Sequence, residues 1–450
     1  MKINKEVLLG RYFDEAIENT KKIVAMPSYR RDLTKGSKLP QDTLNVLNYC
    51  IDLCKSWGLK TFVSEELKYG YADYGDGDKL FVIICHLDVV PPGNISEWIN
   101  PPFEPKIIDD KLYGRGAFDD KGPTMMNLFA FKYLIDNGFK SNYKIRFIFG
   151  TCEETNWECM ENYIANEKLC DLGYVPDGHF PVVYAEKWIA DLDLIGDFKC
   201  NFEIIGGQAY NAVNDLVSYI GPKIDLIQNE LEKINVKSYV ENEILYVKGI
   251  SAHGSLPFKG VSASNSLLFV LNKLNFDHPL IKFVANDIYA DYEMKNIFGN
   301  LEDETGVLTA CNGIIDINKK SFKYTLNLRI PCTRDVQKDV VEKLSSYLIE
   351  KNIKTNTVKL EDRVYFPKDS EVVTKMMSIY QEVTGDYKTE PIAIGGGTFA
   401  KSMPNIIAFG AEFDLNDSTM HSYNEYVKIE DLKKMIEIYA KSIVLLTYNQ

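Results

Sequence analysis

Strongly apolar runs of strand length alternate with segments of helical periodicity in the N-terminal part of the chain. Residues 79–85 (KLFVIIC) and 144–151 (KIRFIFGT) have the length and apolar character of buried strands. Between them, residues 120–138 repeat apolar side chains at helical spacing, with Asp119 or Asp120 as the N-cap. Strand, helix and strand in succession predict an α/β fold, with a largely parallel central sheet flanked by helices.

A second pattern, from about residue 188 to residue 361, interrupts this series and predicts an inserted domain. The stretch contributes no cluster of carboxylates and histidines and has the features of a separate α/β unit. Within it, residues 321–330 (SFKYTLNLRI) alternate strictly between polar and apolar side chains, which predicts a strand with one polar face that ends at Arg329. We therefore expect two domains in this chain.

Composition narrows the functional classes. A chain of 450 residues with 45% hydrophobic and 26% charged residues can bury a large core, and its net charge of −13 argues against a nucleic-acid footprint. The nine cysteines show no C-x-x-C spacing, as is usual for reduced thiols. Because no secretory signal and no apolar run of about 18 residues is visible, we expect a cytoplasmic protein without membrane or nucleic-acid partners.

Potential metal ligands follow the predicted strands or begin the predicted helix. Ligand crevices in parallel sheets form outside the carboxyl ends of the strands, so these side chains are expected to converge. Two histidines and four carboxylates have this position: His86, Asp119, Glu153, Glu154, Asp177 and His421.

This set matches the ligands of a two-metal hydrolase, in which two divalent ions about 3.5–4 Å apart polarise a carbonyl and activate a water. We predict Asp119 as the bridging ligand, because a helix start is a rigid platform. One ion would add His86 and Asp177, and the other Glu154 and His421. Imidazole and carboxylate ligands suit zinc, and a carboxylate-rich mixture also suits manganese or cobalt. The expected cofactor is two divalent ions per chain, Zn or Mn, with Co as a further alternative.

Glu153 and Asp88 have predicted supporting roles. Adjacent glutamates cannot point the same way from an extended segment, so Glu154 would bind metal while Glu153 acts as general base. Asp88 would orient the His86 imidazole by accepting its other N–H. Among the remaining histidines, His179 and His278 have no partner motif and are predicted to be structural or exposed. A turn and a site role both remain open for the histidine of Ser-Ala-His-Gly-Ser at 251–255.

The motifs resemble, in order, those of the dinuclear metallopeptidases that include aminoacylase, acetylornithine and succinyl-diaminopimelate deacylases, carnosinase and carboxypeptidase G. The resemblance covers essentially the whole chain. It is carried by HLDVVPPG, LYGRGAFDDKGP, EE, SAHGSLP and GGGT, at residues 86–93, 112–123, 153–154, 251–257 and 395–398. Within this family, TCEETNWECMENY, PDGHFPVVYAEKW and STMHSYNE, at residues 151–163, 176–188 and 418–425, resemble the PepV-type bacterial dipeptidases.

The resemblance implies the same division of metal ligands and adds roles in the inserted domain. That domain would be a lid, from which His253 stabilises the oxyanion and Arg329, with Asn211, holds the C-terminal carboxylate of the substrate. Arginine suits this role because its guanidinium pairs bidentately with a carboxylate. The sequence departs from the family at Asn214, where proline is common.

Two further features follow from the resemblance alone. The GGGT motif adds Gly396, Gly397 and Thr398 to the implied substrate-binding residues. The family often has a cis peptide after the bridging aspartate, which here is the bond between Asp119 and Asp120.

The resulting hypothesis is a metal-dependent dipeptidase that cleaves unblocked dipeptides. Residues 1–187 and 366–450 would form the catalytic domain and residues 188–365 the lid. An N-acyl amino acid deacylase would share every metal ligand and is the alternative, followed by a non-catalytic metal- or peptide-binding protein. The expected partner is a dipeptide, and PepV-type chains imply a monomer, with a homodimer as the other possibility.

Overall fold

The computed structural model describes residues 1–66, 68–414 and 417–448 and divides the chain into two compact units. The first unit comprises Met1–Tyr184, Phe366–Ile392 and Gly397–Gln450, and the second comprises Ala185–Tyr365 and Ala393–Gly396. Each unit is described by itself. The second is inserted between two parts of the first, so both ends of the chain belong to one unit.

A mixed sheet forms the centre of the first unit. Seven of its nine strands are, in spatial order, β1 (Lys60–Val63), β2 (Tyr69–Tyr74), β6 (Tyr143–Gly150), β3 (Lys79–His86), β7 (Leu172–Val175), β22 (Ile406–Ala408) and β8 (Val183–Glu186). The four central strands β6, β3, β7 and β22 are parallel, whereas β1, β2 and β8 are antiparallel to their neighbours. The predicted α/β class is confirmed, and parallel pairing is confined to the centre of the sheet.

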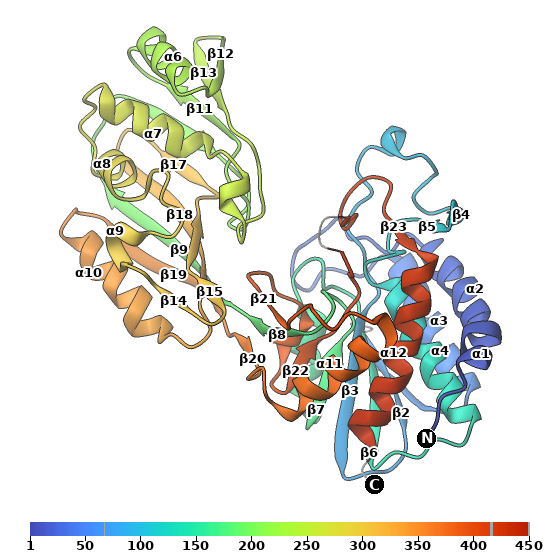
Figure 1. Cartoon of the computed structure of the whole chain (residues 1–450). Helices are drawn as coiled ribbons and strands as arrows, with labels where there is room; N and C mark the ends of the chain where they lie inside the picture. The colour runs from blue at the N-terminus through green and yellow to red at the C-terminus, as the bar shows by residue number, and fades with distance from the viewer. Residues whose placement is uncertain (67, 415–416, 449–450) are drawn as a thin grey trace. The chain divides into compact units, whose positions relative to one another are not determined.

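Helices surround this sheet (Figure 1). They are α1 (Lys5–Val7), α2 (Phe13–Val24), α3 (Gln41–Ser56), α4 (Lys121–Asp136), α5 (Glu158–Asn166), α11 (Glu371–Thr384) and α12 (Ile429–Thr447), with the short segments η1 (Leu8–Tyr12), η2 (Ile95–Glu97) and η6 (Phe399–Ser402). Helix α4 packs against α2 and α12, and it is buried on nearly all sides, as expected for a helix that is apolar all round. The predicted strands and the helix between them are confirmed as β3, β6 and α4, with Asp120 as the N-cap.

A small antiparallel sheet joins distant parts of the first unit. Its strands are β4 (Lys106–Ile108), β5 (Lys111–Tyr113) and β23 (Tyr426–Lys428), in the order β23-β5-β4. Strand β5 leads into the segment that carries Asp119, and β23 follows the segment that carries His421. The sheet therefore places the end of β5, where the first segment begins, beside the start of β23, where the second segment ends.

The second unit is built on an antiparallel sheet in the order β12-β13-β11-β10-β17-β18-β9-β19, with β16 paired to β18. Its strands are β9 (Trp188–Asp197), β10 (Glu203–Gly206), β11 (Leu216–Ile220), β12 (Lys237–Glu241), β13 (Ile244–Lys248), β16 (Thr309–Cys311), β17 (Ile315–Ile317), β18 (Ser321–Ile330) and β19 (Lys354–Glu361). Four short strands complete the list for the chain: β14 (Glu302–Asp303), β15 (Gly306–Val307), β20 (Val364–Tyr365) and β21 (Ile392–Ile394).

Helices cover the core of the second unit. They are α6 (Ile224–Lys233), α7 (Ala263–Lys273), α8 (Pro279–Phe283), α9 (Lys295–Phe298) and α10 (Lys343–Ile349), with the segments η3 (Pro257–Lys259), η4 (Val284–Ile288) and η5 (Val336–Glu342). Helix α7 packs on β11 and β13 and contacts α6 and α8 (Figure 1). Across the parts of the chain that the structure describes, no helix combines the length and apolarity that crossing a membrane requires.

Strand β18 has the bounds that its alternation predicts, but its polar face is buried from Thr325 onward. Thr325, Asn327 and Arg329 are each almost inaccessible to solvent. Asn327 lies so near the loop at Gly254 that a Cβ on that glycine would be 2.8 Å from its Oδ1. Alternation identifies the face of a strand, but it does not show which loops cover that face.

Candidate metal centre

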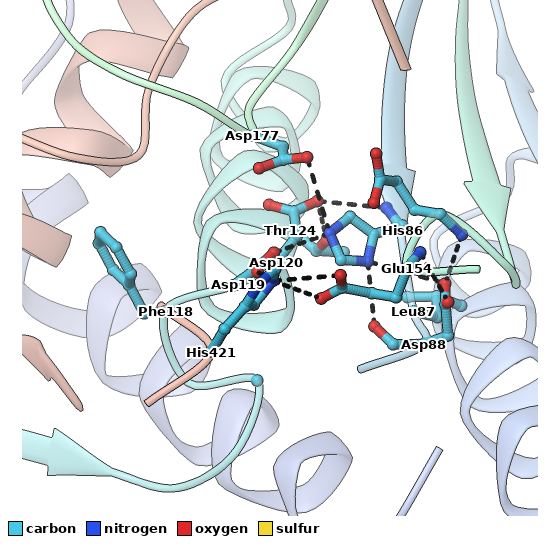
Figure 2. Close-up of polar contacts among 12 residues, drawn as sticks. His86, Leu87, Asp88, Phe118, Asp119, Asp120, Thr124, Glu154, Asp177 and His421 are labelled. Carbon is cyan, nitrogen blue, oxygen red and sulfur yellow. Dashed lines mark hydrogen bonds and ion pairs between the residues drawn. The ribbon is translucent and has the colours of Figure 1, made fainter. Parts of the chain in front are cut away.

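The predicted metal ligands of the first unit lie together in two groups (Figure 2). Within each group, one ligand atom of every residue lies within 4.8 Å of the others. The groups are His86, Asp119 and Asp177, and Asp119, Glu154 and His421. The structure thus brings together the residues predicted for two neighbouring cations, with Asp119 common to both groups.

Asp119 presents its two carboxylate oxygens to two different imidazoles. Its Oδ1 is 2.9 Å from Nε2 of His86, and its Oδ2 is 3.0 Å from Nε2 of His421. Burial disfavours the charged carboxylate, but the hydrogen bonds to His421 and His86 outweigh it and hold the pKa of Asp119 well below its usual range. A carboxylate with one oxygen toward each ligand group has the arrangement that a bridging ligand requires.

The remaining carboxylates are crowded. Oε2 of Glu154 lies 3.1 Å from Nε2 of His421, and Oδ2 of Asp177 lies 3.8 Å from Nε2 of His86. Burial, reinforced by the charge of Asp119, raises the pKa of Glu154 to about 8 and that of Asp177 to about 6. Because the negative charges oppose one another here, divalent cations would relieve a real electrostatic cost. The donor set of imidazoles and carboxylates fits two such ions.

Glu153 precedes Glu154 in the chain and belongs to neither ligand group. Burial, with the charge of Asp177, raises the pKa of Glu153 well above its usual range. Among the described residues, its carboxylate has no hydrogen-bond partner. A half-buried carboxylate with a raised pKa and no competing partner is suited to accept a proton from water.

The contacts of Asp88 correct one part of its predicted role. The backbone carbonyl of Asp88 is 3.0 Å from Nδ1 of His86, whereas its carboxylate is 3.7 Å away. The carboxylate instead accepts the backbone N–H groups of Glu153 at 3.0 Å and Glu154 at 3.1 Å. The prediction that the side chain orients His86 was wrong in this respect, because a spacing of two residues does not distinguish a carbonyl from a carboxylate.

The loop before α4 shows why its sequence is rich in glycine. Gly116 has φ of +87°, and a Cβ there would lie 2.7 Å from Val89. A Cβ at Gly122 would lie 2.1 Å from the carbonyl oxygen of Ala117. The peptide bond between Asp119 and Asp120 is cis, as the resemblance implied.

Asp120 has a role that was not predicted from sequence. Its buried carboxylate accepts the backbone N–H of His86 and the hydroxyl of Thr124, both at 3.2 Å. It therefore ties the end of β3 to the start of α4. The only sequence signal was the second aspartate of the Asp-Asp pair.

The substrate-binding candidates of the second unit form their own cluster. The backbone N–H of Gly254, next to His253, donates to the carbonyl of Asn211 at 2.7 Å. The guanidinium of Arg329 donates to Oδ1 of Asn327 at 2.9 Å and to the carbonyl of Gly395 at 2.7 Å. Burial lowers the pKa of Arg329. Arg329 and the loops of His253 and Asn211 therefore lie around Asn327.

The remaining predicted residues fall on both units. His253 is exposed, and its Nδ1 is 2.7 Å from Oγ of Ser255. Gly396 belongs to the second unit, whereas Gly397 and Thr398 belong to the first. Thr398 is buried and caps η6, since its Oγ1 accepts the N–H of Ala400 at 3.1 Å. Roles in substrate binding remain predictions for all of these residues.

Comparison with known proteins places these features in a family. Residues 82–444, which include all the predicted metal ligands, match the model of peptidase family M20/M25/M40. A protein of Staphylococcus saprophyticus named "Putative dipeptidase" is 32% identical over 468 aligned residues that cover 98% of each chain. A protein of Staphylococcus aureus (strain bovine RF122) with the same designation is 31% identical, again with 98% of each chain covered.

Solved structures share the fold at lower identity. Human carnosine dipeptidase 1 aligns with a TM-score of 0.59 and 15% identity over 98% of both chains. The M20 family metallo-carboxypeptidase Sso-CP2 from Sulfolobus solfataricus aligns with a TM-score of 0.59 and 21% identity, over 96% of this chain and 98% of that one. With its ligand-bearing segments inside the matched region, the chain is a member of peptidase family M20/M25/M40, a family of metal-dependent hydrolases.

Proposed function

We propose that the protein is a two-metal dipeptidase that hydrolyses unblocked dipeptides. The observation that carries this proposal is the pair of ligand groups that share Asp119. The dipeptidase names of the relatives in Staphylococcus support the substrate class. The proposed ligands are His86 and Asp177 on one side of Asp119, and Glu154 and His421 on the other.

In this proposal, bound divalent cations supply Lewis acidity, which polarises the peptide carbonyl and makes water more acidic. Glu153 takes a proton from the attacking water, whose oxygen forms a bond to the carbonyl carbon. When the carbon–nitrogen bond breaks, Glu153 returns the proton to the leaving amine. The hydrogen bonds from the backbone of Glu153 and Glu154 to Asp88 fix the segment from which both glutamates project.

The second unit would act as a lid that supplies two substrate contacts. Arg329 is only 3% exposed, and its contacts from Nε and Nη1 go to neutral oxygens rather than to a carboxylate. Its positive charge therefore remains available for the C-terminal carboxylate of a dipeptide, which a guanidinium binds bidentately. His253 would stabilise the oxyanion, and Asn211 with the GGGT loop would contribute further contacts to the substrate.

Hydrolysis by chelator-stripped protein tests the proposal. The protein is supplied with Zn²⁺, Mn²⁺ or Co²⁺ and assayed on Ala-Ala and N-acetylalanine in parallel. Hydrolysis of Ala-Ala alone, restored by one of the metals, is the expected result. Preference for N-acetylalanine would make the protein a deacylase, and metal binding without hydrolysis of either substrate would favour a binding protein.

A further inference from the structure

Glu425 makes a set of contacts that metal coordination does not explain. It lies four residues after His421, and it is only 1% exposed. Its Oε1 accepts three backbone N–H groups, from Gly116 at 3.0 Å, Phe118 at 3.0 Å and Asp119 at 3.2 Å. One carboxylate oxygen thus holds the loop that ends at the shared aspartate.

The second oxygen of Glu425 is neutralised by an arginine of the same loop. Nη1 of Arg115 donates to Oε2 of Glu425 at 2.6 Å, and both side chains are buried. The guanidinium of Arg115 also lies over the ring of Trp98, 5.1 Å from its centroid. Pairing with Arg115 and the backbone N–H groups offsets only part of the cost of burying this carboxylate, since burial still raises the pKa of Glu425.

The backbone pairing of β5 with β23 places Glu425 opposite the loop that carries Asp119. Strands β23 and β5 are antiparallel, with Tyr426 opposite Tyr113, and the N–H of Gly114 donates to the carbonyl of Glu425 at 3.0 Å. The segment from Gly114 to Asp119 and the segment from His421 to Glu425 therefore leave the same end of this sheet. Glu425 belongs to the segment that carries His421, and its side chain contacts the segment that carries Asp119.

We propose that Glu425 is a positioning residue that couples the Asp119 loop to the His421 loop and so fixes the geometry of the shared carboxylate. The inference rests on the proposed two-metal function. His421 and Asp119 are 302 positions apart, and a metal site requires ligand placement within about 0.5 Å. The N–H of Asp119 itself is held by Glu425, which links the position of one ligand directly to the segment that carries the other.

Glu425→Gln tests the coupling, because it keeps the size of the side chain and removes its charge. Charge-assisted hydrogen bonds are about twice as strong as neutral ones, and the amide N–H₂ would face donors rather than acceptors. The matched control is Glu430→Gln, an exposed glutamate in the first turn of α12. Mn²⁺ and Zn²⁺ are titrated calorimetrically into the chelator-stripped full chain, at a temperature where circular dichroism shows the metal-free protein folded.

We expect Glu425→Gln to weaken the second metal-binding step by about 10–100-fold, with a smaller effect on the first step and none in the control. A purely structural glutamate would lower the melting temperature of the metal-free protein without changing the ratio of the two affinities. Unchanged binding in folded Glu425→Gln, or equal weakening of both steps, would overturn the proposal. A wild-type chain that binds one ion would also overturn it, because no carboxylate would then be shared.

If Glu425→Gln does not fold, Glu425→Asp takes its place, since it keeps the charge and shortens the reach. A smaller selective loss in the second step is then expected, and wild-type binding would refute the coupling. Failure of the dipeptidase proposal is separable from these results. A wild-type chain that binds two ions but does not cleave Ala-Ala would remove the proposed function, while the titrations would still decide the role of Glu425.

Discussion

The contacts of Asp88 allow its side chain and its backbone to be tested separately. Asp88→Ala keeps the carbonyl that contacts His86 and removes the carboxylate that accepts the N–H groups of Glu153 and Glu154. Because the carboxylate contacts the backbone of Glu153 and Glu154, we expect the substitution to disturb the Glu154 side of the centre. If the carboxylate orients His86 instead, it disturbs the His86 side.

The size of the effect follows from the two N–H groups that lose their acceptor. An unsatisfied buried N–H costs about 1–3 kcal/mol, so the pair costs about 2–6 kcal/mol if water cannot replace the carboxylate. Both hydrogen bonds to Asp88 are only partly buried, so water replaces part of the contact and the lower end applies. About 2 kcal/mol corresponds to a loss of about 30-fold in metal affinity at the site that uses Glu154.

Single-site backgrounds make the assay specific. His421→Ala keeps His86, Asp119 and Asp177, whereas His86→Ala keeps the group that contains Glu154. Asp88→Ala is introduced into each background, and Mn²⁺ affinity is measured by calorimetric titration. We expect a loss of about 10–100-fold in the His86→Ala background and of less than about threefold in the His421→Ala background.

The reverse order of losses would refute the assignment, since it would show that the carboxylate of Asp88 acts through His86. Equal losses in both backgrounds would also refute it, because a general disturbance of the unit affects both groups alike. Melting curves of the metal-free variants identify such a disturbance independently.

Three further predictions concern the base, the substrate contact and a buried histidine. Glu153→Gln should lower kcat on Ala-Ala by about 10²–10⁴-fold while both ions still bind, as checked by turnover and metal titration. Arg329→Met should raise KM for dipeptides at least about 30-fold, or about 2 kcal/mol, in steady-state kinetics, because the substrate carboxylate loses its cation. Burial lowers the pKa of His278 to about 4, so the folded protein favours the neutral imidazole. The resulting contribution to the free energy of unfolding is fully present above the ordinary histidine pKa of about 6.5. This stabilisation should be lost as the pH falls from about 6.5 to about 4, by about 3 kcal/mol in total. Urea unfolding of wild type and of His278→Asn measures the loss, and asparagine keeps an acceptor for the N–H of Leu280. Near-normal turnover in Glu153→Gln, a KM within twofold of wild type in Arg329→Met, or the same pH dependence in His278→Asn as in wild type would contradict the respective prediction. Lys354→Met, which removes an exposed charge from β19, is the control for Arg329.

The parts of the fold that the sequence predicts are those governed by local periodicity. Continuous apolar runs mark β3 and β6 because both faces of these strands are buried, and the helical repeat marks α4 between them. The ligand positions follow from the same pattern, since parallel strands bring their carboxyl ends to one edge of the sheet. Strand β18 was predicted with its correct bounds for a similar reason, namely its strict alternation.

Features that depend on contacts between distant segments were not predicted. The half-exposed strand β1 lacks a strong apolar pattern, so the antiparallel edge of the sheet was not recognised. The sequence places Asp88 near His86 but cannot show that its carboxylate turns toward Glu153. Glu425 contacts backbone N–H groups more than 300 positions away, and a backbone donor leaves no signature in the residues that carry it.

The centre depends on both ends of the chain, which explains how a large insertion is compatible with it. Asp119 comes from the segment before the second unit, whereas His421 and Glu425 come from the segment after it. Strand β22, also from the later segment, pairs with β7 and completes the parallel centre of the sheet. The second ligand group therefore cannot form until β22 has paired with β7 and β23 with β5. The first group contains only residues that precede the insertion. Asp119 is shared with the second group, which includes His421, so this aspartate links ligands from the two parts of the first unit.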